Sequence, residues 1–238
     1  MYWIIIAFAL LPIVLLFIYM WVKDMRQPEP IKWLLKALGF GVLSALLVIS
    51  VSMYLPSVSV TSLGTAFLKA FANAAIPEES AKMLMLWLLL RKNPYYDERL
   101  DGIVYAACVS LGFAALENVS YLMSGAADGS WVSTGITRAI FAVPGHFFFG
   151  VLMGFFYGMA SFGETRHRTR NMCLAWLAPV LAHGIYDGIL FSMGTVPPYI
   201  AGILLIVFII AFGRLRRYSV RLITQHQQDD ATQPTQTA

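Results

Sequence analysis

The chain has 238 residues, of which 58% are hydrophobic and 13% are charged, and its mean hydropathy is +0.68. Soluble domains carry about 25% charged residues, so this composition excludes an ordinary soluble enzyme and indicates a protein of the lipid bilayer. The net charge of +4 does not indicate nucleic-acid binding, because Lys and Arg gather at the ends of apolar segments, where they determine topology. The two cysteines, Cys108 and Cys173, form no CxxC pair and predict neither a disulfide framework nor a thiolate metal site.

Seven apolar segments follow one another, close to the length of about 20 residues that crossing a bilayer requires. The sequence therefore predicts an all-α, polytopic membrane helix bundle with about seven transmembrane helices. The first segment lacks the basic stretch and the cleavage site of a signal peptide, so it is expected to be a retained helix. The third contains Pro77 and is expected to be a half-helix followed by a full one. The segments cover residues 2–22, 32–55, 62–91, 102–123, 134–162, 173–193 and 198–213.

Basic residues alternate between the loops. The loops at 56–61, 124–133 and 194–197 contain no Lys or Arg, whereas the other loops and the end of the last segment do. Because cytoplasmic loops carry the excess of Lys and Arg, we expect the N-terminus outside and the C-terminus in the cytoplasm, in the cell's inner (cytoplasmic) membrane. The basic residues are Lys23, Arg26, Lys32, Arg91, Lys92, Arg99, Arg166, Arg168, Arg170, Arg214, Arg216, Arg217 and Arg221.

The predicted domain organisation is simple. Residues 1–223 are expected to form a single transmembrane helical bundle. Residues 224–238 are polar and contain no aromatic side chain, so they are expected to be a disordered cytoplasmic tail.

Four successive segments carry ionisable side chains far from their ends, although each such group costs about 2.5–3.5 kcal/mol at the bilayer centre. At about 1.5 Å per residue, these side chains lie about 15–25 Å from the cytoplasmic ends of their helices, which predicts a single layer slightly outside the midplane. Independent structural roles would scatter them over the membrane depth. The layer is therefore predicted to be one functional site. The residues are Glu78, Glu79, Lys82, Glu117, Asn118, Tyr121, His146, His183 and Asp187.

Spacing within the helices predicts specific pairs. His183 and Asp187 are four residues apart and share a helical face, so the carboxylate can fix the tautomer of the imidazole. Glu78 and Lys82 have the same spacing and are expected to form an ion pair that leaves Glu79 pointing elsewhere.

Other polar and small residues in these segments have simpler interpretations. His146 is followed on its own face by Gly150, Gly154 and Gly158, a stripe that permits close helix packing. Asn118 and Tyr121 are expected to donate hydrogen bonds to the site rather than to act chemically. Three further cations are expected to extend towards a membrane interface: Lys36, Lys69 and Arg138.

The charge of the layer restricts its chemistry. Four carboxylates and one lysine give a net charge of −3 when both histidines are neutral. Such a surplus is unfavourable at low dielectric, so the site requires protonated carboxylates, cationic histidines or a bound metal ion. Strongly perturbed titration of any of these kinds is typical of a functional site.

Four motifs occur in order over about residues 76–190: Glu78-Glu79-x-x-Lys82, Glu117-Asn118-x-x-Tyr121, His146 in a Gly/Phe-rich helix, and His183-x-x-x-Asp187. In this order they resemble the PrsW family of membrane proteases, within the superfamily that includes the CAAX prenyl-protein endopeptidases. The resemblance implies a bacterial intramembrane endopeptidase whose partners are the lipid bilayer and membrane-anchored protein substrates, such as anti-sigma factors. It implies no oligomeric state.

The resemblance also implies roles for individual residues. Glu78 and Glu79 match the paired glutamates, one of which activates water, and His146 and His183 match the two essential histidines. Asp187 stands where relatives have Asn or Asp. The family is classed with metallopeptidases, so His146, His183 and Glu79 would hold a zinc ion that keeps an open position for water. A metal-free glutamate mechanism stays open, because prenyl-protease relatives support one and this chain has no HExxH motif.

Peptide hydrolysis requires a water molecule, a base and a group that stabilises the oxyanion. We expect Glu79 or Glu78 to activate water that His146 orients. His183, held by Asp187, would stabilise the oxyanion or protonate the leaving amine. Glu117 and Asn118 would support these groups, or Glu117 would add a ligand if a metal binds.

Two other classes of function are compatible with buried ionisable residues. The first is a non-catalytic scaffold related to the scaffold subunit of gamma-secretase, but loss of the paired glutamates would be expected there. The second is an ion-coupled transporter, for which broken helices and carboxylates within the membrane are typical. Seven segments without an inverted repeat argue against the transporter.

Overall fold

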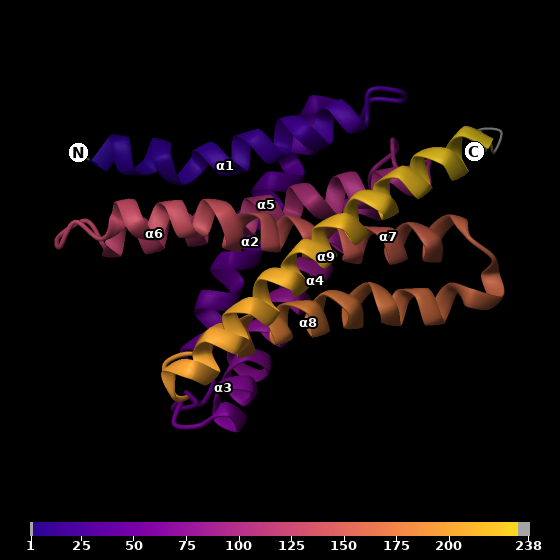
Figure 1. Cartoon of the computed structure of the whole chain (residues 1–238). Helices are drawn as coiled ribbons and strands as arrows, with labels where there is room; N and C mark the ends of the chain where they lie inside the picture. Colours follow the sequence, from indigo (N-terminus) through magenta and orange to yellow (C-terminus); the bar gives the residue numbers. More distant parts are fainter. Residues whose placement is uncertain (1, 233–238) are drawn as a thin grey trace.

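The computed structural model describes residues 2–232, and that range is helical, with no strand. Helices α1, α5, α7 and α8 run roughly side by side, and α9 crosses them diagonally (Figure 1). Two π-helical segments, η1 (Ala70–Ala75) and η2 (Arg138–Ala142), and a 3₁₀ turn at Thr165–His167 connect helices. The helices are α1 (Tyr2–Lys23), α2 (Ile31–Ser52), α3 (Leu63–Lys69), α4 (Ile76–Leu90), α5 (Arg99–Ser124), α6 (Trp131–Thr137), α7 (Val143–Phe162), α8 (Arg168–Ser192) and α9 (Pro198–Thr232).

Six helical segments of the described range are long and apolar enough to cross a membrane: α1, α2, α5, α6 with α7, α8 and α9. The predicted all-α, multi-pass membrane protein is therefore confirmed. The third expected segment is helical as well, but η1 divides it into α3 with 7 residues and α4 with 15. The seventh crossing stays a prediction that rests on this divided segment.

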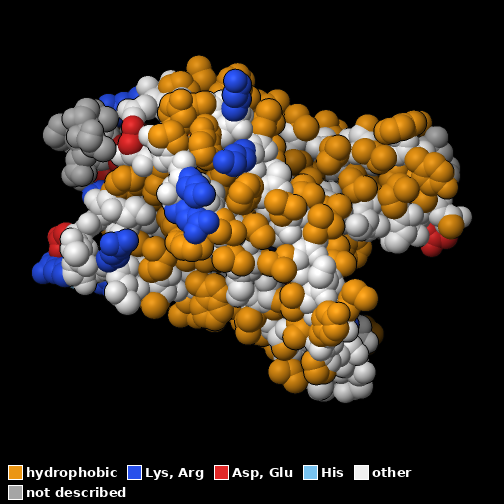
Figure 2. Space-filling view, turned by 180° about the vertical axis from the view of Figure 1, so that it is seen from behind, with side chains coloured by type: hydrophobic (Ala, Val, Ile, Leu, Met, Phe, Trp, Pro, Cys, Tyr) orange, Lys and Arg blue, Asp and Glu red, His pale blue; other side chains and the backbone are white. Residues whose placement is uncertain are grey.

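Helix α5 forms the centre of the bundle. Every residue from Leu100 to Ala114 is buried, and α5 packs against α7, α2 and α1. The outer helices expose apolar side chains, as lipid-facing helices do. Hydrophobic side chains cover most of the face seen in Figure 2, and most of the Lys and Arg side chains on this face lie in its left half.

Glycines allow α5 and α7 to approach each other closely. A Cβ atom added at Gly102 would lie 2.7 Å from the carbonyl oxygen of Gly154 and 3.0 Å from the backbone nitrogen of Gly158. A Cβ atom at Gly150 would lie 2.6 Å from the Ser110 hydroxyl. The glycine stripe predicted for the helix of His146 is therefore confirmed as a close-packing surface.

The substitution Gly102→Ala is expected to destabilise the bundle by about 1–3 kcal/mol, because the added methyl group meets backbone atoms that cannot move independently. Gly39→Ala is the matched control, since a Cβ atom there would meet nothing within 4 Å. Both changes gain the same helix propensity, so the difference between their melting temperatures in detergent measures the overpacking. Equal melting temperatures would contradict the close α5–α7 contact.

The end of α9 differs from the sequence prediction. Disorder was expected from residue 224, but the helix continues to Thr232. Asp230 accepts hydrogen bonds from the backbone N–H groups of Arg99 and Leu100, at 3.3 and 2.9 Å, and Asp229 lies 3.5 Å from the Arg99 guanidinium. These N–H groups belong to the first turn of α5 and have no acceptor within their own helix. The docking orders residues 224–232, and the remainder of the expected tail, 233–238, lies outside the described residues.

Candidate active site

Two site residues lie just after π-helical segments. Segment η1 leads into Pro77 near the start of α4, and η2 leads into Pro144 near the start of α7. Because proline has no N–H group, a carbonyl in the preceding turn loses its usual partner, and a wider turn accommodates this loss. Glu78 follows the first proline directly, and His146 lies two residues after the second. Widened turns of this kind are frequent at functional sites.

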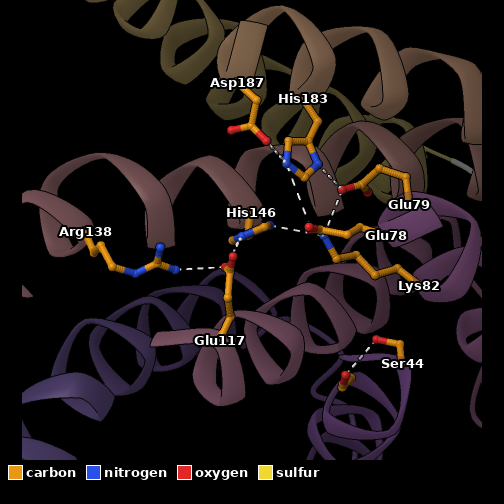
Figure 3. A network of polar contacts seen from close by, with 10 residues as sticks. Ser44, Glu78, Glu79, Lys82, Glu117, Arg138, His146, His183 and Asp187 are labelled. Atoms are coloured by element: carbon orange, nitrogen blue, oxygen red, sulfur yellow. Dashed lines mark hydrogen bonds and ion pairs between the residues drawn. The ribbon is translucent and has the colours of Figure 1, made fainter. Parts of the chain in front are cut away.

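The Lys82 ammonium occupies the middle of the cluster (Figure 3). Its Nζ atom lies 2.8 Å from Glu79 Oε1, 3.6 Å from Glu78 Oε2 and 3.1 Å from His146 Nδ1. The predicted ion pair between Glu78 and Lys82 is present, but the prediction that Glu79 points elsewhere is wrong. Lysine reaches the nearer, fully buried Glu79 because residues three apart on a helix are also neighbours. Since an ammonium only donates, His146 Nδ1 is an acceptor and the proton of this imidazole lies on Nε2.

His183 joins α8 to the paired glutamates of α4. Its Nδ1 atom lies 2.9 Å from Glu79 Oε1, and its Nε2 atom lies 3.3 Å from Asp187 Oδ2 and 3.9 Å from Glu78 Oε2. The predicted pairing of His183 with Asp187 is confirmed. The ring of Phe149 stacks on the imidazole with 4.8 Å between centroids. Both ring nitrogens of His183 therefore face carboxylate oxygens.

Glu117 connects α5 to both sides of the site. Its Oε2 atom accepts hydrogen bonds from His146 Nε2 and from Arg138 Nη2, both at 2.8 Å. Asn118 Oδ1 accepts from Arg138 Nε at 2.7 Å, while its amide donates to a carbonyl of α1. The guanidinium carbon of Arg138 lies 4.1 Å from the centre of the Tyr121 ring. The three residues of the Glu117-Asn118-x-x-Tyr121 motif therefore share one cationic partner.

The prediction that Arg138 extends towards an interface is wrong, and this arginine is the residue that sequence reasoning missed. Its side chain is only 12% exposed and points to Glu117 (Figure 3). Counting Arg138 with Lys82 reduces the surplus of the four carboxylates from −3 to −2. The charge surplus of −3 was the sequence signal that could have revealed Arg138, because it required a further positive charge near the layer.

A cavity of about 340 Å³ opens beside the network. Among the paired glutamates, Glu78 lines this cavity and Glu79 does not. The size is within the range of small-ligand sites, and the wall opposite the charged groups is largely aromatic and aliphatic. Leu205 and Phe208 bring α9 into this wall. The ionisable residues that line the cavity are Glu78, Glu117, Tyr121, Arg138, His146, His183, Tyr186 and Asp187.

Four residues could hold a metal ion. Glu78, Glu79, His146 and His183 each offer one ligand atom, and these atoms lie within 4.8 Å of one another. Imidazole nitrogens and carboxylate oxygens are a donor set that zinc accepts. The Oε2 atoms of Glu78 and Glu79 are buried and have no hydrogen-bond partner among the described residues. The donor set and these two free oxygens fit a divalent metal ion.

Comparison with known proteins identifies the family. The model of the PrsW family intramembrane metalloproteases matches residues 29–213, which include all nine predicted site residues. This chain belongs to the PrsW family. Three bacterial relatives, each named Protease PrsW, cover most of the chain. The relative from Geobacillus kaustophilus is 36% identical, over 79% of this chain and 80% of its own length. The relatives from Oceanobacillus iheyensis and Bacillus subtilis are 33% and 32% identical; the matches cover 90% and 94% of this chain, and 95% and 98% of the relatives' own lengths. No solved structure matches.

Membership of the PrsW family confirms the function class that the sequence predicts. The chain is a membrane-embedded peptidase, and neither the scaffold nor the transporter is favoured. The family description as metalloprotease agrees with the buried Glu/His group. In the structure, all nine predicted site residues join one connected group, in which Asn118 and Tyr121 contact the centre through Arg138.

Proposed function

We propose that this cluster is the catalytic centre at which peptide bonds of membrane-anchored proteins are hydrolysed, and that Glu78 is the residue that activates water. One observation carries the assignment of the base. Glu78 lines the cavity, whereas Glu79 is fully buried, does not line it, and binds Lys82 and His183 at 2.8 and 2.9 Å. A base must reach both the water and the scissile carbonyl, and only Glu78 of the pair meets that requirement.

The other residues of the cluster are assigned the remaining roles in hydrolysis. Glu78 takes a proton from the water that attacks the peptide carbonyl. His183 Nε2, beside Asp187 at the cavity wall, donates to the developing oxyanion or to the leaving amine. Glu79 and Lys82 act by positioning: Glu79 orients His183, and Lys82 sets the tautomer of His146.

We propose zinc as the metal, with His146, His183 and Glu79 as its ligands. A bound zinc ion supplies Lewis-acid polarisation of the carbonyl and activation of water. Metal analysis of the purified protein tests the ligands without any activity assay: one zinc per chain is expected in the wild type and less in His146→Ala. Cleavage that a strong chelator does not affect, together with no bound metal, would instead support a metal-free glutamate mechanism.

The first functional test uses His183→Ala with purified protein in liposomes that contain single-span membrane proteins. Cleavage is expected to fall by a factor of about 10²–10⁴, because the donor to the oxyanion or leaving amine is lost. His167→Ala is the matched control, since His167 lies in the α7–α8 connection and is absent from the cavity. Wild-type cleavage by His183→Ala would remove this residue from the mechanism.

The positions of the helices also bear on the topology of the chain and on how a substrate reaches the cavity. The start of α1 and the end of α9 lie at opposite ends of the molecule (Figure 1), which agrees with an N-terminus outside and a C-terminus in the cytoplasm of the inner membrane. We assign residues 1–223 to a single bundle.

Helix α9 is almost entirely unburied yet contributes to the cavity wall, so a substrate helix would enter laterally beside it. Anti-sigma factors with one membrane anchor are the proposed substrate class.

A further inference from the structure

A second group of acidic side chains lies where the α1–α2 loop meets the start of α5. Asp24 and Glu29 come from the loop, Glu98 precedes α5, and Asp101 lies in its first turn. Asp24, Glu29 and Asp101 are buried, with 1%, 6% and 0% exposure. Asp24, Glu98 and Asp101 each offer a carboxylate oxygen, and these oxygens lie within 4.8 Å of one another. This acidic group is separate from the residues of the catalytic cluster.

Two of these carboxylates are fixed by the backbone and keep one oxygen free. Asp24 Oδ2 accepts a hydrogen bond from the N–H of Glu29 at 2.8 Å. Asp101 Oδ2 accepts from the N–H groups of Asp97 and Glu98, at 3.0 and 2.9 Å. The other oxygens, Asp24 Oδ1 and Asp101 Oδ1, are buried and have no hydrogen-bond partner within residues 2–232. A buried acceptor without a hydrogen bond costs free energy, so these two oxygens require a further group that binds them.

That partner is not a basic side chain of the described range. No Lys or Arg of residues 2–232 forms an ion pair with Asp24, Glu29, Glu98 or Asp101, whereas the catalytic carboxylates are paired with Lys82 and Arg138. The hydroxyl of Tyr105 donates to Glu29 but adds no charge. Several buried carboxylates without a compensating cation repel one another.

We propose that this acidic group binds one hard divalent cation, Ca²⁺ or Mg²⁺, that fastens the α1–α2 loop to the start of α5. Both ions prefer ligand sets made only of oxygen, and carboxylates are their usual protein ligands. The two preoriented free oxygens of Asp24 and Asp101 are the core of the site, with Glu98 as a third ligand. The inference does not depend on the proposed catalytic mechanism, because it concerns a different set of residues.

The test is thermal unfolding of the purified full chain in detergent at pH 8, with CaCl₂ or MgCl₂ added after removal of metals. At a 100-fold excess over the dissociation constant, a bound ion is expected to raise the melting temperature by about 5–10 °C. The double variant Asp24→Asn/Asp101→Asn is expected to lose this shift, because it keeps the oxygens that accept the backbone hydrogen bonds but removes two charges. Glu164→Gln, an exposed carboxylate in the α7–α8 connection, is the matched control and is expected to keep the shift.

Two further measurements keep the test decisive. His146→Ala is expected to keep the Ca²⁺ or Mg²⁺ shift, which separates this site from the proposed zinc site. Should the double variant fail to fold, Tb³⁺ luminescence of the wild type replaces it: Ca²⁺ should displace one Tb³⁺ that is sensitised by a nearby tyrosine such as Tyr105. No shift with either ion in the wild type, an equal shift in the double variant, or no displaceable Tb³⁺ would overturn the proposal.

Discussion

Glu78→Gln is expected to lower peptide cleavage by a factor of about 10²–10⁴ while lowering the melting temperature of the protein only slightly. The amide keeps the size of the side chain but cannot take a proton from water. Glu78 lines the cavity, and its Oε2 lies 3.6 Å from Lys82 and 3.9 Å from His183, so its ion pairs are longer than the 2.8 Å pair of Glu79 with Lys82 and less stability depends on its charge.

Glu79→Gln is expected to lose stability as well as activity, unlike Glu78→Gln. This change leaves the fully buried Lys82 with only the more distant Glu78 as a carboxylate partner, and breaking a buried pair costs about 3–5 kcal/mol. Both cleavage and the melting temperature should fall. Cleavage in liposomes and thermal unfolding in detergent are measured on the same preparations, with Glu164→Gln as the control. A stable, inactive Glu79→Gln beside a destabilised Glu78→Gln would reverse the assignment.

Arg138→Gln is expected to reduce cleavage by a factor of about 10–100, because the site loses one of its two fixed cations. The loss of charge-assisted hydrogen bonds, each worth about 1.5–3 kcal/mol, releases Glu117 and Asn118 together. Arg138→Lys is expected to restore only part of the activity, since an ammonium cannot reproduce the two separate directions of a guanidinium.

Lys36→Gln is the matched control for the arginine. Lys36 is an exposed cation over the Trp33 ring and takes no part in the cavity. Cleavage rates and melting temperatures are compared among the four proteins. An Arg138→Gln variant that matches Lys36→Gln in both would show that Arg138 only extends to the membrane interface.

The sequence predicted that the site residues gather in one cluster, because helix geometry is regular. A fixed rise per residue brings Glu79, Glu117, His146 and His183 to one layer, and the four-residue spacing of His183 and Asp187 became a 3.3 Å contact. Periodicity does not determine which of several neighbours a long side chain contacts, so the preference of Lys82 for Glu79 was not predictable.

Contacts between distant segments account for the other differences. Arg138 belongs to η2, a π-helical segment that no sequence pattern predicted. Its partners, Glu117 and Asn118, lie about 20 positions earlier in α5. The final turns of α9 are helical because Asp230 caps α5, 130 and 131 residues earlier in the chain. A polar composition alone predicted disorder there, since composition does not reveal a docking surface.

The most direct test of the catalytic site is cleavage of a single-span membrane protein by the purified chain in liposomes, with the cut position mapped by mass spectrometry. The wild type is expected to cut a bond within the substrate's membrane span, and Glu78→Gln is expected to leave the substrate intact at equal protein amount. Equal cleavage by the wild type and Glu78→Gln would contradict the assignment of this cluster as the active site.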